Sequence, residues 1–170
     1  IDFALGDASE LPYDDGSFDV VVSRLAVHHF ANPGPIVSEM ARVCKPGGRI
    51  ILADIIADDD PAVHAEMDRL EILRDPSHTA MVTVQDLHEL LRATGRTEVQ
   101  PHSGTVYMHK VPLDWWMDNT ETPPAAREEI HRAIKAEMEG GKVTGFQPFV
   151  DEEGKVTFLH RYAVAQGIRV

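Results

Sequence analysis

The chemistry that this sequence can support starts with its histidines. The chain has nine, and a histidine can move a proton near neutral pH because its unperturbed pKa is about 6.5. His28 and His29 are adjacent, whereas the others are scattered along the chain. No His-Glu-x-x-His or Cys-x-x-Cys spacing occurs, so the sequence predicts no metal site. Adjacent side chains usually point apart, so we expect at most one of the pair to face a given pocket.

Carboxylates and the single thiol offer fewer candidates. Asp54 lies near the end of a predicted strand, where it can face a pocket or simply close a turn. The run of aspartates at 58–60 is most simply a solvated loop that leads to a helix cap. Cys44 falls on the apolar side of a predicted helix, so we interpret it as a small buried hydrophobe and not as a nucleophile.

Three β-like runs must position these side chains, at residues 1–5, 18–23 and 49–56. They are apolar with little alternation, which is typical of strands covered on both faces in a parallel sheet. Between the second and third runs, apolar residues recur at helical spacing over 36–44. Strand, helix and strand with short connections predict a right-handed βαβ unit.

The rest of the chain continues this α/β pattern. Helices are predicted from Asp60-Pro61 and from Thr83 to Gly95, followed by weaker strands at 96–100 and 104–109 and a last strand at 156–166. The residue pattern of 112–150 differs from that of the flanking α/β segments. We therefore predict one domain over 1–170 with an insertion at about 112–150. Within it, Trp115 and Trp116 either cover a substrate or anchor the insertion onto the core.

The composition and charge of the chain limit the classes of partner that it can bind. The chain is 43% hydrophobic and 26% charged, as is usual for a globular protein. Its net charge of −12 repels phosphate groups, so we expect neither nucleic acid nor an anionic membrane as a partner. No apolar run approaches the roughly 18 residues that span a bilayer. One cysteine excludes an internal disulfide and fits a reducing compartment, so we expect a cytoplasmic protein.

A set of short motifs occurs in a fixed order within residues 6–54. They are Gly6-Asp7-Ala8, Leu11-Pro12, Ser17-Phe18-Asp19, His28-His29-Phe30 and Lys45-Pro46-Gly47-Gly48. This order resembles that of the class I S-adenosylmethionine-dependent methyltransferases, and within them the small-molecule branch that includes the ubiquinone and menaquinone methyltransferases. The resemblance implies a Rossmann-like, mostly parallel sheet with flanking helices.

The resemblance also implies where the adenine of the cofactor binds. In the family, the acid at the position of Asp7 accepts a hydrogen bond from the adenine amino group. The backbone N–H of the next residue, here Ala8, meets a ring nitrogen. The alternative is that Asp7 merely ends a strand in a turn.

The loop after the second β-like run is implied to border the methionine part of the cofactor. It comprises Ser23, Arg24 and Leu25, at the carboxyl end of a strand, where open α/β sheets bind ligands. An ordinary strand-to-helix loop is the alternative. A base near the methyl acceptor could be a histidine, because its pKa lies near the working pH, and His29 is our catalytic candidate. The alternative is that one histidine of the pair is solvated and the other packs beside the cofactor.

Two features of the family are not found in these residues, namely the glycine-rich cofactor loop and the acid that holds the ribose. The family's sheet order is 3-2-1-4-5-7-6, so we expect the chain to begin at the third strand and to lack the first two. Their loss opens a gap in the sheet. Three outcomes are expected: the segment is cut away or disordered, a second copy fills the gap as a homodimer or strand-swapped dimer, or the flanking strands close together.

The sequence therefore predicts an enzyme that transfers a methyl group from S-adenosylmethionine to a small molecule, chiefly by in-line positioning. This chain alone is expected to bind the cofactor weakly or not at all, and to be inactive. The alternative is a non-catalytic interaction module that dimerises through its open sheet edge. A further alternative is an enzyme with another nucleotide ligand, because a fold does not determine a function.

Overall fold

A six-stranded mixed sheet runs through the protein, for which a computed structural model describes residues 2–100 and 104–170. The strand order is β1-β2-β6-β3, and β4 and β5 also pair with β6. By their contacts, the residues form two compact units. Unit 1 comprises 1–54, 84–105 and 163–170, and unit 2 comprises 55–83 and 106–162.

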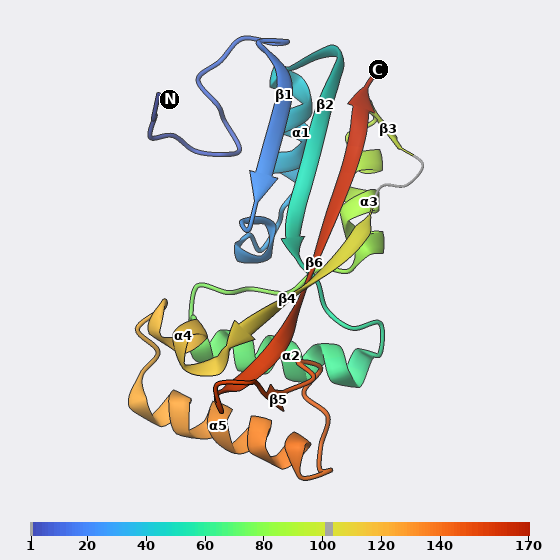
Figure 1. The fold of residues 1–170 in the computed structure, drawn as a ribbon. Helices are drawn as coiled ribbons and strands as arrows, with labels where there is room; N and C mark the ends of the chain where they lie inside the picture. The colour runs from blue at the N-terminus through green and yellow to red at the C-terminus, as the bar shows by residue number, and fades with distance from the viewer. Residues whose placement is uncertain (1, 101–103) are drawn as a thin grey trace. The chain divides into compact units, whose positions relative to one another are not determined.

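Unit 1 contains the predicted βαβ unit. Strands β1 (Phe18–Arg24) and β2 (Cys44–Ile55) are parallel, and helix α1 (Gly34–Val43) connects them. Their register pairs Val21 with Ile50 and Ser23 with Leu52. Figure 1 shows β1, β2 and the end of β6 (Val156–Arg169) side by side. The α/β class is therefore confirmed.

The glycines before the apolar part of β2 make a bulge. Phe18 pairs with Cys44, but Val20 pairs with Arg49, so β2 has extra residues there. A Cβ on Gly48 would lie 2.7 Å from Cys44 Sγ and 2.8 Å from the carbonyl oxygen of Asp19. Glycine is required at this position because the neighbouring backbone leaves no room for a side chain.

Two further elements complete unit 1. Helix α3 (Val84–Ala93) follows the predicted segment closely, and it contacts α1. Strand β3 (Thr97–Val99) pairs antiparallel with the end of β6, with Thr97 opposite Arg169. The buried side chains of Ile50 and Leu52 lie on one face of the sheet. Val20 and Val22 are 49% and 56% exposed.

The predicted strand at residues 1–5 is wrong. Residues 2–5 form no helix or strand, and Phe3 and Leu5 are 94% and 103% exposed. Figure 1 shows this segment as an irregular loop. An apolar run becomes a strand only where another strand accepts its backbone hydrogen bonds. Among the described residues, none pairs with this segment.

Unit 2 is built on the long helices α2 (Pro61–Arg74) and α5 (Pro124–Met138), which contact each other. Helix α2 begins as predicted, because Asp60 Oδ1 accepts hydrogen bonds from the N–H groups of Ala62 (2.8 Å) and Val63 (3.3 Å). Strands β4 (Thr105–Pro112) and β5 (Phe149–Val150) pair with β6, and α4 (Leu113–Asp118) follows β4.

An aromatic cluster forms the core of unit 2. The ring of Trp116 lies 5.1 Å from that of Phe158 and 5.4 Å from that of Phe146, between centroids. Trp116 is buried, whereas Trp115 is 58% exposed. The contacts of Trp116 are those of an anchor for its segment. In the part of the chain that the structure describes, no helix is long and apolar enough to cross a membrane.

Candidate functional site

The carboxyl end of β1 carries the predicted residues Ser23, Arg24 and Leu25. The parallel ladder continues one residue beyond the strand, because the N–H of Leu25 donates to the carbonyl oxygen of Ala53 at 2.9 Å. Leu25 has a φ of +52°, which is unusual for a residue with a side chain. Such backbone strain gathers at ligand sites, and open α/β sheets bind ligands at this end of their strands.

Asp54 organises the loop that follows. It is fully buried near the end of β2, and its Oδ2 accepts hydrogen bonds from the N–H groups of Val27 (2.7 Å) and Ala26 (3.2 Å). These groups begin the short 3₁₀ helix η1 (Val27–His29), so the carboxylate stabilises its N-terminal end. The sequence alternatives for Asp54 were a pocket residue or a strand-end turn, and neither included this role.

His28 is held by the other oxygen of the same carboxylate. Its Nδ1 lies 2.5 Å from Asp54 Oδ1, and its side chain is 8% exposed. An ionised carboxylate can only accept, so the contact fits the tautomer of His28 in which Nδ1 is the donor. A histidine whose orientation is set by a buried carboxylate is the arrangement that general bases use. The sequence signal for it was an aspartate at the end of one parallel strand and a histidine after the neighbouring strand.

His29 stacks on His28. Their ring centroids are 4.1 Å apart with an interplanar angle of 44°, and His29 is half-buried. The expectation that the two side chains point apart is therefore wrong, because the tight 3₁₀ turn brings the rings together. Leu25, His28, His29 and Asp54 thus form one group at the strand ends, which we call the strand-end cluster. The catalytic role of His29 stays a prediction.

The predicted adenine site lies in an exposed turn. Oδ1 of Asp7 accepts hydrogen bonds from the N–H (2.8 Å) and the hydroxyl (2.7 Å) of Ser9. These bonds lower the pKa of Asp7, so the carboxylate is ionised at neutral pH. Ala8 is half-buried. Asp7 lies in a turn, as its alternative expected, but no strand precedes that turn among the described residues, and its charge leaves it able to accept from an amino group.

The loop after this turn is fastened to α1 and not to the strand-end cluster. Glu39 Oε1 accepts from the N–H of Leu11 at 2.8 Å, and Arg42 Nη2 donates to the carbonyl oxygen of Leu11 at 3.1 Å. Arg42 also pairs with Asp15 at 2.8 Å. The hydrogen bond from Arg42 is the main cause of a lowered pKa at Glu39. Both predicted parts of the site are thus attached to the same βαβ unit.

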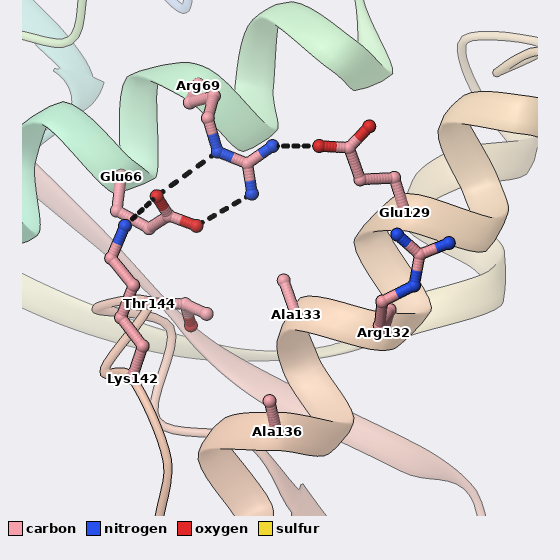
Figure 2. A pocket seen from close by; sticks show the side chains of 8 residues that line it. All are labelled: Glu66, Arg69, Glu129, Arg132, Ala133, Ala136, Lys142 and Thr144. Atoms are coloured by element: carbon pink, nitrogen blue, oxygen red, sulfur yellow. Dashed lines mark hydrogen bonds and ion pairs between the residues drawn. The ribbon is translucent and has the colours of Figure 1, made fainter.

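Unit 2 contains a charged hollow that the sequence did not predict, with a volume of about 380 Å³. Figure 2 shows Arg69 between Glu66 and Glu129, and Lys142 beside Glu66. Glu66 lies 2.7 Å from Arg69 and 2.5 Å from Lys142. The bond from Arg69 is the main reason why the pKa of Glu66 is lowered. These contacts join α2 to α5, so we interpret this charged hollow as structural.

Metal ligation finds no support in these side chains. Among residues 2–100 and 104–170, no group of three or more histidines, cysteines or acids could hold a metal ion. Some contacts join one histidine to one carboxylate, such as His131 to Asp114 at 3.2 Å, whereas Asp68 contacts both His64 at 3.3 Å and His78 at 3.1 Å. Such contacts orient an imidazole without completing the ligand set of a cation.

Comparison with known proteins bears on the resemblance. Residues 1–52 match the family model described as "Methyltransferase domain". The chain is 29% identical over 170 residues to the uncharacterized methyltransferase YcgJ of Bacillus subtilis, covering 98% of this chain and 65% of YcgJ. The crystal structure of YcgJ superimposes with a TM-score of 0.82 at 28% identity, over 96% of this chain and 69% of that one. The predicted resemblance to methyltransferases is confirmed.

A second relative extends the comparison to a named substrate. The chain is 34% identical over 120 residues to the 2-methyl-6-phytyl-1,4-hydroquinone methyltransferase of Synechocystis. The aligned region covers 68% of this chain and 37% of that enzyme. The chain thus spans less than two thirds of the length of these curated relatives. The Rossmann-like fold class is confirmed by the likeness to YcgJ.

Proposed function

We propose that the protein is an S-adenosylmethionine-dependent methyltransferase that acts on a small molecule. The observation that carries the proposal is the likeness to YcgJ over nearly the whole chain, together with a strained loop at the ends of two parallel strands. The cofactor supplies a methyl group that is electrophilic because it is bound to a sulfonium. The chain's own residues then have to bind, orient and shield the reactants.

The residues present fit this cofactor in two respects. The ionised, exposed carboxylate of Asp7 suits the amino group of adenine, and the small side chain of Ala8 leaves its backbone accessible. In the strand-end loop, Leu25 N–H is bound to Ala53 and Val27 N–H to Asp54. The carbonyl oxygens of Ala26 and Val27 accept from the N–H groups of His29 and Phe30, but a carbonyl oxygen has a second lone pair, which suits the ammonium of the methionine portion.

His29 is our candidate for the group nearest the methyl acceptor. It is half-buried and stacked on His28, which Asp54 orients. If the acceptor must lose a proton before transfer, a neutral imidazole at this place can take it. The small-molecule class of the acceptor follows from the relatives that are named for such reactions. We place the protein in the cytoplasm, where its one buried thiol stays reduced.

Calorimetric titration with S-adenosylhomocysteine tests the proposal. We expect binding that is weak for this chain, because neither a glycine-rich loop nor a ribose-binding acid was found in it. Asp7→Ala should weaken that binding by about tenfold through loss of one charge-assisted hydrogen bond. Asp14→Ala, in the same loop and also exposed, is the matched control. Equal loss in both variants contradicts the placement of adenine at Asp7. Absence of binding even when a segment with a glycine-rich cofactor loop is joined ahead of the chain contradicts the cofactor assignment.

A second candidate function has one observation in its favour. Strand β1 stands at the end of the sheet order, and Phe18, Val20 and Val22 are 37%, 49% and 56% exposed. Exposed apolar edge strands pair readily with other chains. A non-catalytic module that dimerises through β1 would be dimeric by sedimentation and monomeric as Val22→Lys.

The domain organisation, a single domain over residues 1–170 with an insertion at about 112–150, also stays a prediction.

A further inference from the structure

A second hollow of unit 2 differs from the charged one in its lining. Its volume is about 490 Å³, within the range of about 300–1,000 Å³ that small-molecule sites occupy. Its lining comes from α4, α5 and the start of β6. The residues are Leu113, His131, Ile134, Lys135, Met138, Glu139 and Val156. We call it the apolar hollow.

The walls of the apolar hollow combine a rigid part with an adaptable one. Leu113 and Ile134 are 1% and 2% exposed, so close packing fixes their positions. Met138, in contrast, is 40% exposed at the last residue of α5, and Val156 is half-buried. A methionine adapts to the shape of a ligand because it is unbranched and polarisable. Covering these apolar atoms would remove them from water, which favours binding.

The polar groups around the apolar hollow compensate one another. His131 Nε2 lies 3.2 Å from Asp114 Oδ1, and Lys135 Nζ lies 3.7 Å from Glu139 Oε1 one helical turn away. His131 and Lys135 therefore each have a carboxylate beside them, and a charged ligand would have to compete with that partner. This balance favours an uncharged ligand.

The charged hollow provides the contrast. Its lining includes Arg69, Arg132 and Lys142, and its acids are engaged by ion pairs across α2 and α5 (Figure 2). An apolar ligand there would have to desolvate those ions, which is unfavourable without new partners. Unit 2 thus has one hollow built for ion pairing and one that can accept an apolar molecule.

We propose that the apolar hollow binds a neutral, mainly apolar small molecule that fits within its volume of about 490 Å³. The site is made entirely by unit 2 and requires neither the cofactor nor the strand-end cluster. It goes beyond the proposed function, and it stands or fails independently of methyl transfer.

The experiment uses the full chain with carbon-13 in its methionine methyl groups and farnesol as the probe. The chain has six methionines, and Met138 is the one that lines the apolar hollow. Met108, 51% exposed on β4 in the same unit, serves as an internal control. We expect farnesol to shift the Met138 methyl resonance until it saturates, with no saturable shift at Met108.

Two tryptophan variants test the location. Met138→Trp fills the apolar hollow from its exposed side and should weaken farnesol binding by at least about tenfold. Met108→Trp adds the same ring elsewhere in unit 2 and should leave the affinity unchanged. Circular dichroism confirms that each variant folds. Because the unmutated chain is titrated first, a misfolded variant does not leave the proposal undecided.

Three results would overturn the proposal. The first is the absence of any shift at Met138 up to the solubility limit of farnesol. The second is an equal, unsaturated shift at Met138 and Met108, which would mean adsorption to exposed apolar surface. The third is tighter binding of decanoate than of farnesol, lost in Lys135→Gln, which would make the ligand anionic.

Discussion

The two units each contain a buried pair of a histidine and a carboxylate, and the surroundings of the pairs differ. In unit 1, Asp54 holds His28 at 2.5 Å and also accepts two backbone N–H groups of a strand-end loop. In unit 2, Glu71 lies 3.1 Å from His160 and 3.0 Å from Arg74. The first carboxylate therefore organises the backbone of the candidate site, whereas the second lies between an arginine and a histidine in a packed core.

The neighbours of Glu71 are those of a core. The ring of His160 lies 5.5 Å from Phe158 and 5.1 Å from Tyr162, and Arg74 stacks over Trp116 at 4.9 Å. Among the described residues, no backbone N–H group donates to the carboxylate of Glu71, and the non-glycine residues of unit 2 with positive φ, Glu121 and Gln147, are not members of the pair. The comparison teaches that a short histidine–carboxylate contact identifies a candidate site only when the backbone around it is also arranged for a ligand.

The largest expected effect comes from removing the core carboxylate. Glu71→Ala leaves His160 and Arg74 largely buried without an anion, so we expect a loss of about 3–5 kcal/mol in the free energy of unfolding. Urea unfolding measures it, with Glu152→Ala, an exposed acid of the same unit, as the control. A loss below about 1 kcal/mol would show that the pair is not a structural element.

A smaller loss is expected at the strand ends. Asp54→Asn keeps the shape but replaces one accepting oxygen by a donor, so one of its hydrogen bonds to Val27 or His28 is lost. We expect a loss of about 1.5–3 kcal/mol in unfolding free energy. The His29 ring resonances in NMR spectra should also move, because the stacked His28 reorients.

The matched controls for this variant sharpen the comparison. Asp59→Asn, at an exposed acid, should change neither stability nor the His29 resonances. Glu71→Gln should lower stability while leaving His29 unchanged. A shift of His29 in both Glu71→Gln and Asp54→Asn would remove the distinction between the two pairs.

The pH dependence of stability separates the core pair further. Burial raises the pKa of Glu71, but the hydrogen bond and charge of His160, together with Arg74 and His78, outweigh it and lower the pKa overall. A lowered folded-state pKa contributes stability above the unfolded value of about 4.3, and this is lost as the pH falls through the folded-state pKa. The stability difference between the natural chain and Glu71→Gln should therefore shrink on acidification. A difference independent of pH would contradict this.

The smallest effect concerns the strained residue of the strand-end cluster. At its φ of +52°, Leu25→Gly relieves strain that Leu25→Ala retains, while both lose the apolar contacts that Leu25 makes beyond Cβ. We expect the glycine variant to be more stable than the alanine variant by about 1 kcal/mol in urea unfolding. The opposite order would mean that the left-handed conformation is not populated in solution.

Local signals in the sequence predicted much of unit 1 and the beginnings of several helices. The β-branched run at 18–23 and the helical spacing over 36–44 became β1 and α1, and Asp60-Pro61 begins α2. The motif order also led to the methyltransferase resemblance that the comparisons confirm. Such signals succeed because hydrogen bonds within a helix and the alternation of a strand depend on near neighbours in the chain.

The features that the sequence did not predict depend on contacts between segments that lie far apart in the chain. Residues 1–5 have the composition of a strand, yet a strand exists only beside another, and residues 2–5, the part that the structure describes, remain exposed. Asp54 lies 26 residues from His28, and no spacing rule links them. Likewise, only packing distinguishes buried Trp116 from exposed Trp115.

By itself, the sequence determined the helical and strand tendencies, the acidic charge and the order of motifs that points to a methyl-transfer fold. Tertiary structure alone decided which carboxylate meets which histidine, how the rings of His28 and His29 stack, and where unit 2 leaves an apolar hollow. The physical reason is that local conformation depends on adjacent residues, whereas burial, pairing and cavities depend on segments that only folding brings together.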